Sequence, residues 1–315
     1  MRDYVIRRAL LALLTLAIVV FVSFILLRLT PGDAVMQKVA AGGLVDPSRI
    51  EQFRHQLGID DPVMVQFGHY LNGIAHGDFG TSFQTSRPTI NEFGSALPVT
   101  LELGVIALIF SIVLGVPLGI WSAIRQDSPS DYIGRTIAVL GIAVPSFWLG
   151  ILLIVYPSIW FKWEWPRGSP SLFTDTATNL KAFIVPGMVL GFASSAYVMR
   201  FMRTTMLNTL REDYIRTARS KGLVERVVVM RHAVRVSLLP VVTLIGAQLG
   251  VLLGGSVIIE QLFGLAGVGQ QTFIAVQARD YPQLQTNLLI LSAAIVISNL
   301  LTDLCYRLLD PRVSY

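Results

Sequence analysis

The chain has 315 residues, of which 53% are hydrophobic and only 14% are charged. Soluble domains carry about 25% charged residues, so this composition excludes an ordinary soluble domain and predicts an integral membrane protein. The net charge of +5 does not indicate nucleic acid as a partner, because the cations cluster at the ends of apolar segments. The single cysteine, Cys305, excludes an internal disulfide and any multi-cysteine metal site.

Six apolar segments are long enough to cross the roughly 30 Å hydrocarbon core of a bilayer. They run over about Ala9–Leu27, Val99–Ile124, Ile133–Trp160, Phe183–Met206, Leu238–Phe263 and Leu284–Leu308. The first follows three arginines as a signal peptide would, but no small-x-small cleavage site comes after it, so we predict an uncleaved helix. Most of the 25 Lys and Arg residues fall on the side that holds both termini. This bias predicts cytoplasmic termini and an all-α fold of six transmembrane helices.

A large hydrophilic insert follows the first predicted span, over about residues 30 to 97. Asp46-Pro47-Ser48 begins a predicted helix that Gly58 ends. The spacing of Met64, Phe67, Tyr70 and Leu71 predicts a second helix, and Gly77-Asp78-Phe79-Gly80 predicts a turn. The insert meets an external partner or caps the span ends, and the sequence leaves both open. We predict two parts: residues 1–96, the first helix with this extracytoplasmic insert, and residues 97–315, a five-helix membrane domain.

A basic, amphipathic segment separates the fourth and fifth predicted spans, over about residues 207–237. We predict a short helix from Asp213 to Ser220 within it. Asp213 lies at the N-terminal end, where the helix dipole favours anions, and Lys221 at the other end, where it favours cations. Gly222 can adopt the left-handed conformation that stops a helix.

The faces of this predicted helix differ. Tyr214, Thr217 and Ala218 share one face, while Arg216 and Arg219 point elsewhere. Contact with lipid headgroups alone is the alternative interpretation. Two small residues in the middle of a weakly apolar face favour close contact with a groove on another protein instead. His232 lies in the basic run that follows and is interpreted as part of the same segment.

This segment resembles the cytoplasmic loop of ATP-binding-cassette (ABC) importer permeases, whose short coupling helix docks on an ATPase subunit. Their broad pattern is Glu-Ala-Ala, three residues, Gly and a later Leu-Pro. Here Arg216-Thr217-Ala218 and Gly222 occupy those positions, and Pro240 comes later than the pattern has it. The first two of these residues and the late proline depart from the broad pattern. Both departures resemble the dipeptide, oligopeptide and nickel branch of the family, and in particular its B-type dipeptide permeases. Further matches are Thr30-Pro31-Gly32-Asp33, Leu57-Gly58-Ile59-Asp60, Gly77-Asp78-Phe79-Gly80, Leu239-Pro240-Val241-Val242-Thr243, Gly254-Gly255, Arg279-Asp280-Tyr281-Pro282 and Leu309-Asp310-Pro311-Arg312.

The resemblance covers nearly the whole chain and implies a type-I ABC importer permease in a bacterial or archaeal inner membrane. It implies four kinds of neighbour: a homologous second permease, two ATPase subunits, an extracytoplasmic solute-binding protein and membrane lipid. ATP and Mg would bind the ATPase subunits, so we expect no cofactor, metal or catalytic residue in this chain. The resemblance implies that the ATPase-coupling residues are Asp213, Tyr214, Arg216, Thr217, Ala218, Arg219, Lys221, Gly222 and His232. Peptide is the expected solute, with nickel, glutathione or an oligosaccharide as alternatives.

The fifth predicted span carries a stripe of small residues, in which Gly246, Gly250 and Gly254 recur every four residues beside Gly255. Such stripes allow helices to approach closely in membranes. The stripe either packs inside this subunit, or lines the solute path or the seam with a second permease. We favour the second interpretation, together with the polar residues Gln248 and Glu260.

Two rival interpretations lack support in the sequence. Gly264 to Gln271 has the glycine spacing of a phosphate-binding loop, but Gln270 and Gln271 occupy the positions of the required lysine and hydroxyl residue. An ion-coupled secondary transporter would need ionisable groups near the middle of its spans, and the central stretches contain no acidic residue and no histidine.

Overall fold

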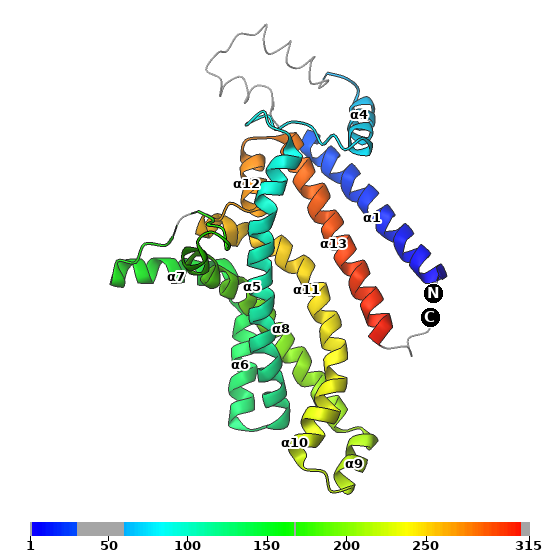
Figure 1. Ribbon diagram of the computed structural model, residues 1–315, viewed down its shortest axis with the longest axis vertical. Coiled ribbons are helices and arrows are strands. Elements are labelled where there is room, and N and C mark those ends of the chain that lie inside the picture. The colour runs from blue at the N-terminus through cyan, green and yellow to red at the C-terminus, as the bar shows by residue number, and fades with distance from the viewer. Residues whose placement is uncertain (1, 30–59, 167, 310–315) are drawn as a thin grey trace. The chain divides into compact units, whose positions relative to one another are not determined.

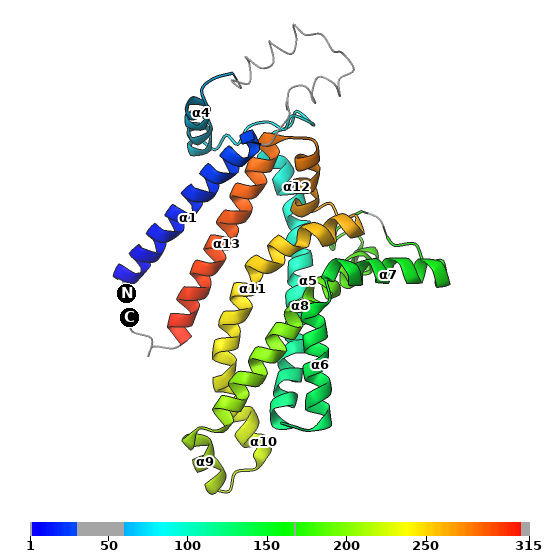
Figure 2. The same ribbon diagram turned by 180° about the vertical axis from the view of Figure 1, so that it is seen from behind.

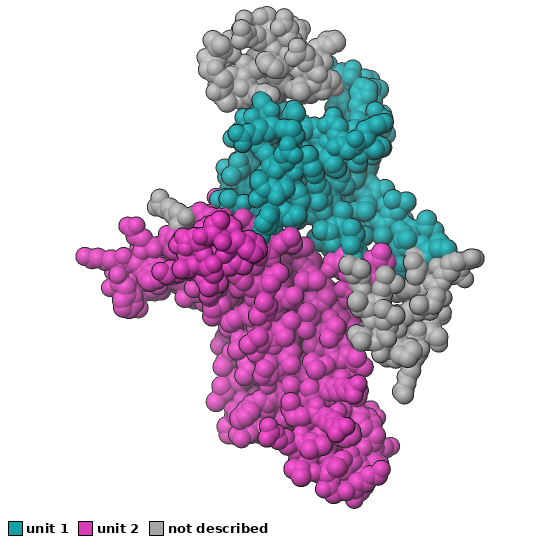
Figure 3. Space-filling view, in the orientation of Figure 1, with its two compact units in different colours: residues 1–98, 266–297 teal, residues 99–265, 298–315 magenta. Residues whose placement is uncertain are grey.

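The computed structural model describes residues 2–29, 60–166 and 168–309 (Figure 1). Every regular element among them is a helix, apart from an isolated antiparallel bridge between Thr81 and Pro88. The predicted all-α class is therefore confirmed. The helix predicted from Asp46 to Gly58 lies outside the described residues. Contacts divide the chain into two compact units, one of residues 1–98 with 266–297 and one of residues 99–265 with 298–315 (Figure 3).

Among the described residues, five long helices contain stretches apolar enough to cross a membrane. They are α1 (Arg2–Leu29), α5 (Thr89–Ile124), α8 (Thr176–Leu210), α11 (Val234–Phe263) and α13 (Tyr281–Leu309). Each overlaps one of the predicted spans. The exposed face of α5 carries Leu101, Val105, Ile109 and Val113 at four-residue spacing, which suits a surface in contact with lipid or another apolar helix.

The third predicted span is not a single helix. Its residues form α6 (Pro129–Ala143) and α7 (Ser146–Phe161), whose axes are bent by 93°. Pro145 sits at the break and cannot donate a backbone hydrogen bond, and it disfavours helical geometry in the residue before it. Val144 is accordingly extended, with φ −81° and ψ 122°. The span predicted over Ile133–Trp160 is therefore broken at Pro145 rather than straight. If the bent pair crosses the membrane once, the described residues hold the six predicted spans.

Helix α8 is the central helix of the second unit. In its most apolar window 67% of the residues are buried, against 28% or less in the other candidate spans. It packs against α6, α7 and α11. Its N-terminus is capped by the exposed Asp175, which accepts a hydrogen bond from the Thr178 amide at 3.2 Å. Hydrogen bonding from the Thr178 side chain, and then from its backbone amide, lowers the pKa of the Asp175 carboxyl. Among the candidate spans α8 is therefore the most buried, and it packs against three neighbouring helices.

The crossing of α5 and α8 is made by two pairs of glycines, each pair spaced four residues apart. On α5, Cβ atoms placed on Gly115 and Gly119 would lie 2.6 and 2.7 Å from backbone carbonyl oxygens of α8. On α8, Cβ atoms on Gly187 and Gly191 would overlap α5 at Ile106 and Ala107. Small residues at this spacing allow two helix backbones to meet in a membrane. The crossing is therefore a contact of backbone on backbone.

We expect Gly191→Ala to destabilise the protein by about 1–3 kcal/mol, since the new methyl group overlaps the Ala107 carbonyl, which cannot move aside as a flexible side chain would. The matched control is Gly254→Ala in α11, where no atom lies within 4 Å of the new Cβ position. Alanine favours a helix interior over glycine, so the control should be neutral or stabilising. Thermal unfolding of the detergent-purified variants measures both. Equal unfolding midpoints for the Gly191→Ala and Gly254→Ala variants would show that the α5–α8 crossing has room for a methyl group.

The first unit holds α4 (Val63–Ala75) and α12 (Val268–Gln277), together with most of α13. The predicted second helix of the insert is confirmed by α4, whose Phe67 packs against Phe24 of α1 with ring centroids 5.0 Å apart. The predicted turn is confirmed as well. Gly77 and Gly80 have positive φ, and the Gly80 amide donates to Asp78 Oδ1 at 2.8 Å.

Candidate functional site

The short helix α9 (Asp213–Ser220) has the predicted bounds and is followed by Gly222 in the left-handed region, with φ +76°. Its Ile215 is fully buried and its Ala218 is 7% exposed. Both belong to an apolar cluster of the second unit, with partners from α8, the π-helix η1 (Val228–Ala233) and α11. These buried partners are Met202, Met206, Val228, Val229, Ala233 and Val234. Figures 1 and 2 show α9 beside α10 (Glu225–Val227), near the end of α8.

The outward face of α9 is polar and largely exposed. It presents Asp213, Tyr214, Arg216, Thr217 and Arg219, with Lys221 at the end of the helix. Arg216 pairs with Asp213 at 3.1 Å between Nη1 and Oδ1. Arg219 pairs with Glu225 through two hydrogen bonds of 2.7 and 3.2 Å. Exposed pairs of this kind add about 0–1 kcal/mol each, so they fix side-chain directions more than they stabilise the helix.

Two of these side chains also have shifted proton affinities. The hydrogen bond to Glu225 raises the pKa of the Arg219 guanidinium, and partial desolvation of the exposed Tyr214 raises the pKa of its phenol. Arginine and tyrosine are protonated at neutral pH even without such shifts, so this face carries hydrogen-bond donors.

The face expected to contact a partner is divided by the structure. Ala218 points into the chain's own apolar cluster, while Tyr214 and Thr217 remain exposed. His232 lies in η1 and is partly buried. Only the exposed residues can therefore touch another protein directly, and Ala218 acts by fixing α9 to its own unit.

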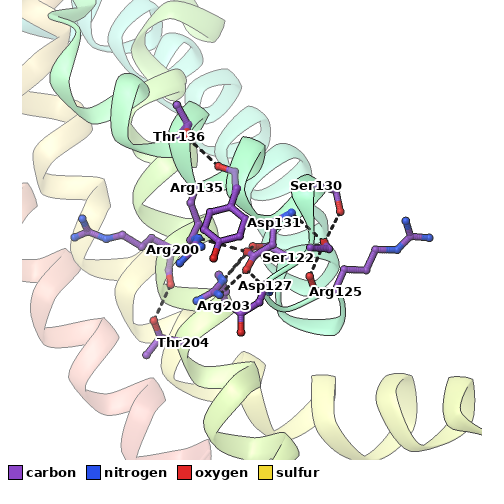
Figure 4. A network of polar contacts seen from close by, with 12 residues as sticks. Ser122, Arg125, Asp127, Ser130, Asp131, Arg135, Thr136, Arg200, Arg203 and Thr204 are labelled. Atoms are coloured by element: carbon purple, nitrogen blue, oxygen red, sulfur yellow. Dashed lines mark hydrogen bonds and ion pairs between the residues drawn. The ribbon is translucent and has the colours of Figure 1, made fainter.

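A buried ion pair joins α6 to α8 (Figure 4). Asp131 is fully buried, and Arg203 approaches it with Nε 2.9 Å from Oδ1 and Nη2 2.8 Å from Oδ2. The same carboxylate accepts hydrogen bonds from the Ser122 hydroxyl and, at 3.0 Å, from the Asp127 amide. Arg135 lies 3.8 Å away on the next turn of α6. A bidentate pair with these additional donors compensates the charge that burial would otherwise penalise.

The ion pair fixes the loop between α5 and α6 to the helix that leads into α9. Arg203 follows Met202 and precedes Met206, both of which belong to the apolar cluster that holds Ile215. The pair and the cluster therefore form one continuous connection from α6 through α8 to α9. All of these residues lie in the second unit.

The sequence analysis missed this pair. Arg203 counted only as one of the cations on the predicted cytoplasmic side. A local signal exists at Asp131, because Ser128 caps α6, Pro129 follows, and Asp131 occupies the third helical position, as an acid does in a capping box. That pattern locates the helix start, but it does not reveal that the carboxylate binds an arginine 72 residues away.

The predicted glycine stripe does not act as a single surface. Gly246 meets Thr302 of α13 inside this subunit, with no room for a Cβ atom, whereas Gly254 faces open space. Gly250 is partly buried and Gly255 also lies in α11. The polar residues are both buried: Gln248 is 9% exposed, and Glu260 accepts a hydrogen bond from Thr100 Oγ1 at 2.8 Å. Packing within the chain accounts for Gly246 and Glu260, so a role in the solute path or the subunit seam stays a prediction for Gln248, Gly250, Gly254 and Gly255.

Solved structures with this arrangement of helices are parts of ABC importers. One is described as inward-facing conformations of the MetNI methionine ABC transporter, with a TM-score of 0.57 and 17% identity over 72% of this chain and 100% of that one. Another is an amino acid ABC transporter with histidines, with a TM-score of 0.51 and 21% identity over 71% of this chain and 95% of that one. At these identities the likeness defines the fold, which is that of an ABC importer permease.

Sequence comparison gives the family. Residues 115–315 match the binding-protein-dependent transport system inner membrane component, and residues 1–104 match the N-terminal part of such membrane components. Glutathione transport system permease proteins GsiC from Pectobacterium atrosepticum and Escherichia coli K12 are each 38% identical over all 315 residues, covering 100% of both chains. The chain belongs to the family of binding-protein-dependent inner membrane transport components. It is a multi-pass permease subunit of an ABC importer.

Proposed function

We propose that this chain forms half of the translocation path of an ATP-driven importer of short peptides. A homologous second permease would complete the path. Two ATPase subunits would dock on the cytoplasmic side and an extracytoplasmic binding protein would deliver the solute. ATP hydrolysis would take place on the separate ATPase chains, so the permease itself carries no catalytic residue.

The observation that carries this proposal is the construction of α9. Two buried residues, Ile215 and Ala218, hold the helix in the apolar cluster, while its charged and hydrogen-bonding face stays outside. A surface helix of eight residues is too short to be stable alone, so its stability comes from this packing. A protein that binds the exposed face and moves α9 would therefore move α8 and α11 as well.

The solute is proposed from the relatives. The permeases that are 38% identical over the full length are named for glutathione, a short peptide-like thiol, and we propose a solute of this class. Nickel and oligosaccharides remain the alternatives. Uptake of radiolabelled glutathione and dialanine by cells that express the complete importer, with and without this chain, tests the class. Uptake of neither solute in cells that do take up nickel would contradict it.

We expect Lys221→Glu to weaken binding of the ATPase subunits at least about fivefold and to lower uptake in proportion, since it reverses an exposed charge at the end of α9 without touching either buried anchor. The change also opposes the helix dipole by about 0.3–1 kcal/mol. Co-purification of ATPase with the tagged chain measures the binding.

The matched control is Lys181→Glu, the same reversal at an exposed position near the opposite end of α8. It should leave ATPase binding unchanged. Equal recovery of ATPase with both variants would show that α9 is not the docking element, and absence of any ATPase from the wild-type preparation would contradict the proposed function as a whole.

A further inference from the structure

The first unit contains a polar cavity of about 390 Å³. Its walls come from the loop that precedes α5, from the first turns of α5, from α12 with the loop before it, and from the turn into α13 with the start of that helix. Figure 1 shows where these elements lie. All of its lining residues belong to one compact unit, drawn in teal in Figure 3. This volume lies within the range of pockets that bind small molecules and is far larger than the roughly 30 Å³ that one water occupies.

The amide of Gln283, which lines the cavity, is held in one orientation by a relay of hydrogen bonds. The Thr272 hydroxyl donates a hydrogen bond to the Val268 carbonyl oxygen at 2.6 Å. Thr272 Oγ1 can then only accept from Asn287, and it does so from Nδ2 at 3.0 Å. Asn287 Oδ1 then faces Gln283 and accepts from its Nε2 at 2.8 Å. The carbonyl oxygen of Gln283 is therefore the free end of the relay. The residue is 2% exposed, and this oxygen has no hydrogen-bond partner.

A second cavity residue, Gln271 of α12, also has a buried carbonyl oxygen without a partner. The carboxylate of Glu92 lines the same cavity. The other acid in the lining, Asp280, already accepts hydrogen bonds from the Ser82 hydroxyl and from the backbone N–H groups of Phe83, Gln84 and Gln283. Two residues of the lining thus carry buried carbonyl oxygens without a donor, and each such acceptor costs about 1–3 kcal/mol.

We propose that this cavity binds the free α-amino group of a small zwitterion such as an amino acid or a short peptide. A primary ammonium carries three N–H donors, and residues that line the cavity carry three acceptors for it: Gln271 Oε1 and Gln283 Oε1, which lack partners, and the Glu92 carboxylate. Arg87, also in the lining, supplies the opposite charge for the carboxylate of the ligand. The site is distinct from α9. Its ligand belongs to the solute class of the proposed function, on which this inference rests in part, but binding is measured here without transport, so the two can fail separately.

The test is calorimetric titration of the complete permease complex, reconstituted in lipid nanodiscs without the binding protein. The probes are L-alanyl-L-alanine and its N-acetyl derivative, which lacks the ammonium. We expect the free dipeptide to bind and acetylation to weaken binding at least about tenfold, since it removes a charge-assisted donor set. A third probe is L-alanyl-L-alaninamide, in which an amide replaces the carboxylate. It should bind more weakly than the free dipeptide if Arg87 holds the carboxylate.

Two variants locate the binding. Gln283→Met removes one acceptor but also breaks the relay to Asn287, whereas Gln271→Met removes the other acceptor and leaves the relay intact. Each should weaken dipeptide binding at least about tenfold. The control is Gln277→Met on the exposed side of the same helix, which should bind as the wild type does. Equal binding of acetylated and free dipeptide, or unchanged binding in Gln271→Met, would overturn the proposal while leaving the import function standing.

Discussion

Replacing Arg203 by methionine is expected to destabilise the folded protein by about 3–5 kcal/mol. The substitution leaves the fully buried carboxylate of Asp131 without the guanidinium that contacts both of its oxygens, and losing the close partner of a buried charge exposes much of its desolvation cost. The Ser122 hydroxyl and the Asp127 amide remain as neutral donors, and Arg135 remains as a more distant cation, with its Nε 3.8 Å from Asp131 Oδ1. Fluorescence-detected size exclusion after heating measures the loss of folded protein.

The control removes both charges. Arg203→Met combined with Asp131→Leu should recover most of the lost stability, because an apolar pair of similar volume has no charge to desolvate. If the single variant is as stable as the wild type, the carboxylate does not depend on Arg203. If the double variant stays as unstable as the single one, the loss comes from packing around the arginine stem.

Ile215→Ala is expected to uncouple ATP hydrolysis from transport. The substitution opens a cavity where α9 meets α8, η1 and α11, at a cost of about 2–5 kcal/mol, and alanine keeps the helix itself intact. A loosened α9 can still bind the ATPase through its exposed face but transmits less of its movement. We expect uptake to fall at least about tenfold while ATPase activity in the same proteoliposomes persists.

Ile215→Leu is the matched control, since it conserves volume and should cost less than about 1.5 kcal/mol. Its uptake should stay close to the wild-type rate. Two results would contradict the role of Ile215: full uptake in the alanine variant, or a loss of ATPase binding that parallels the loss of uptake. The second result would mean that the substitution disrupts the docking face rather than the anchor.

The elements that could be predicted from the sequence are those with local signals. The bounds of α9 follow from an acid in its first turn and a glycine after its last, all within ten residues. The long spans follow from length and hydropathy alone. The family resemblance covered nearly the whole chain and is confirmed by the matches over residues 1–104 and 115–315.

The features that were missed depend on which residues meet across helices. Neither Asp131 nor Arg203 marks its partner in the sequence, because the register of α6 against α8 is set by packing. The glycine stripe on α11 was apparent, but only packing decides that Gly246 meets Thr302 and Gly254 meets nothing. The bend at Val144 had a local signal in Pro145, which the length of the apolar run outweighed.

The backbone contact between α5 and α8 has a consequence for how relatives of this protein diverge. A side chain that grows on one helix is normally tolerated when a partner on the other shrinks, and such paired changes reveal contacts in alignments. Glycine has no side chain that could become smaller. A larger residue at one of the four positions, Gly115, Gly119, Gly187 and Gly191, therefore cannot be compensated at another. Statistical methods that infer contacts from correlated substitutions should therefore find no signal between these four glycine positions, although the helices touch there.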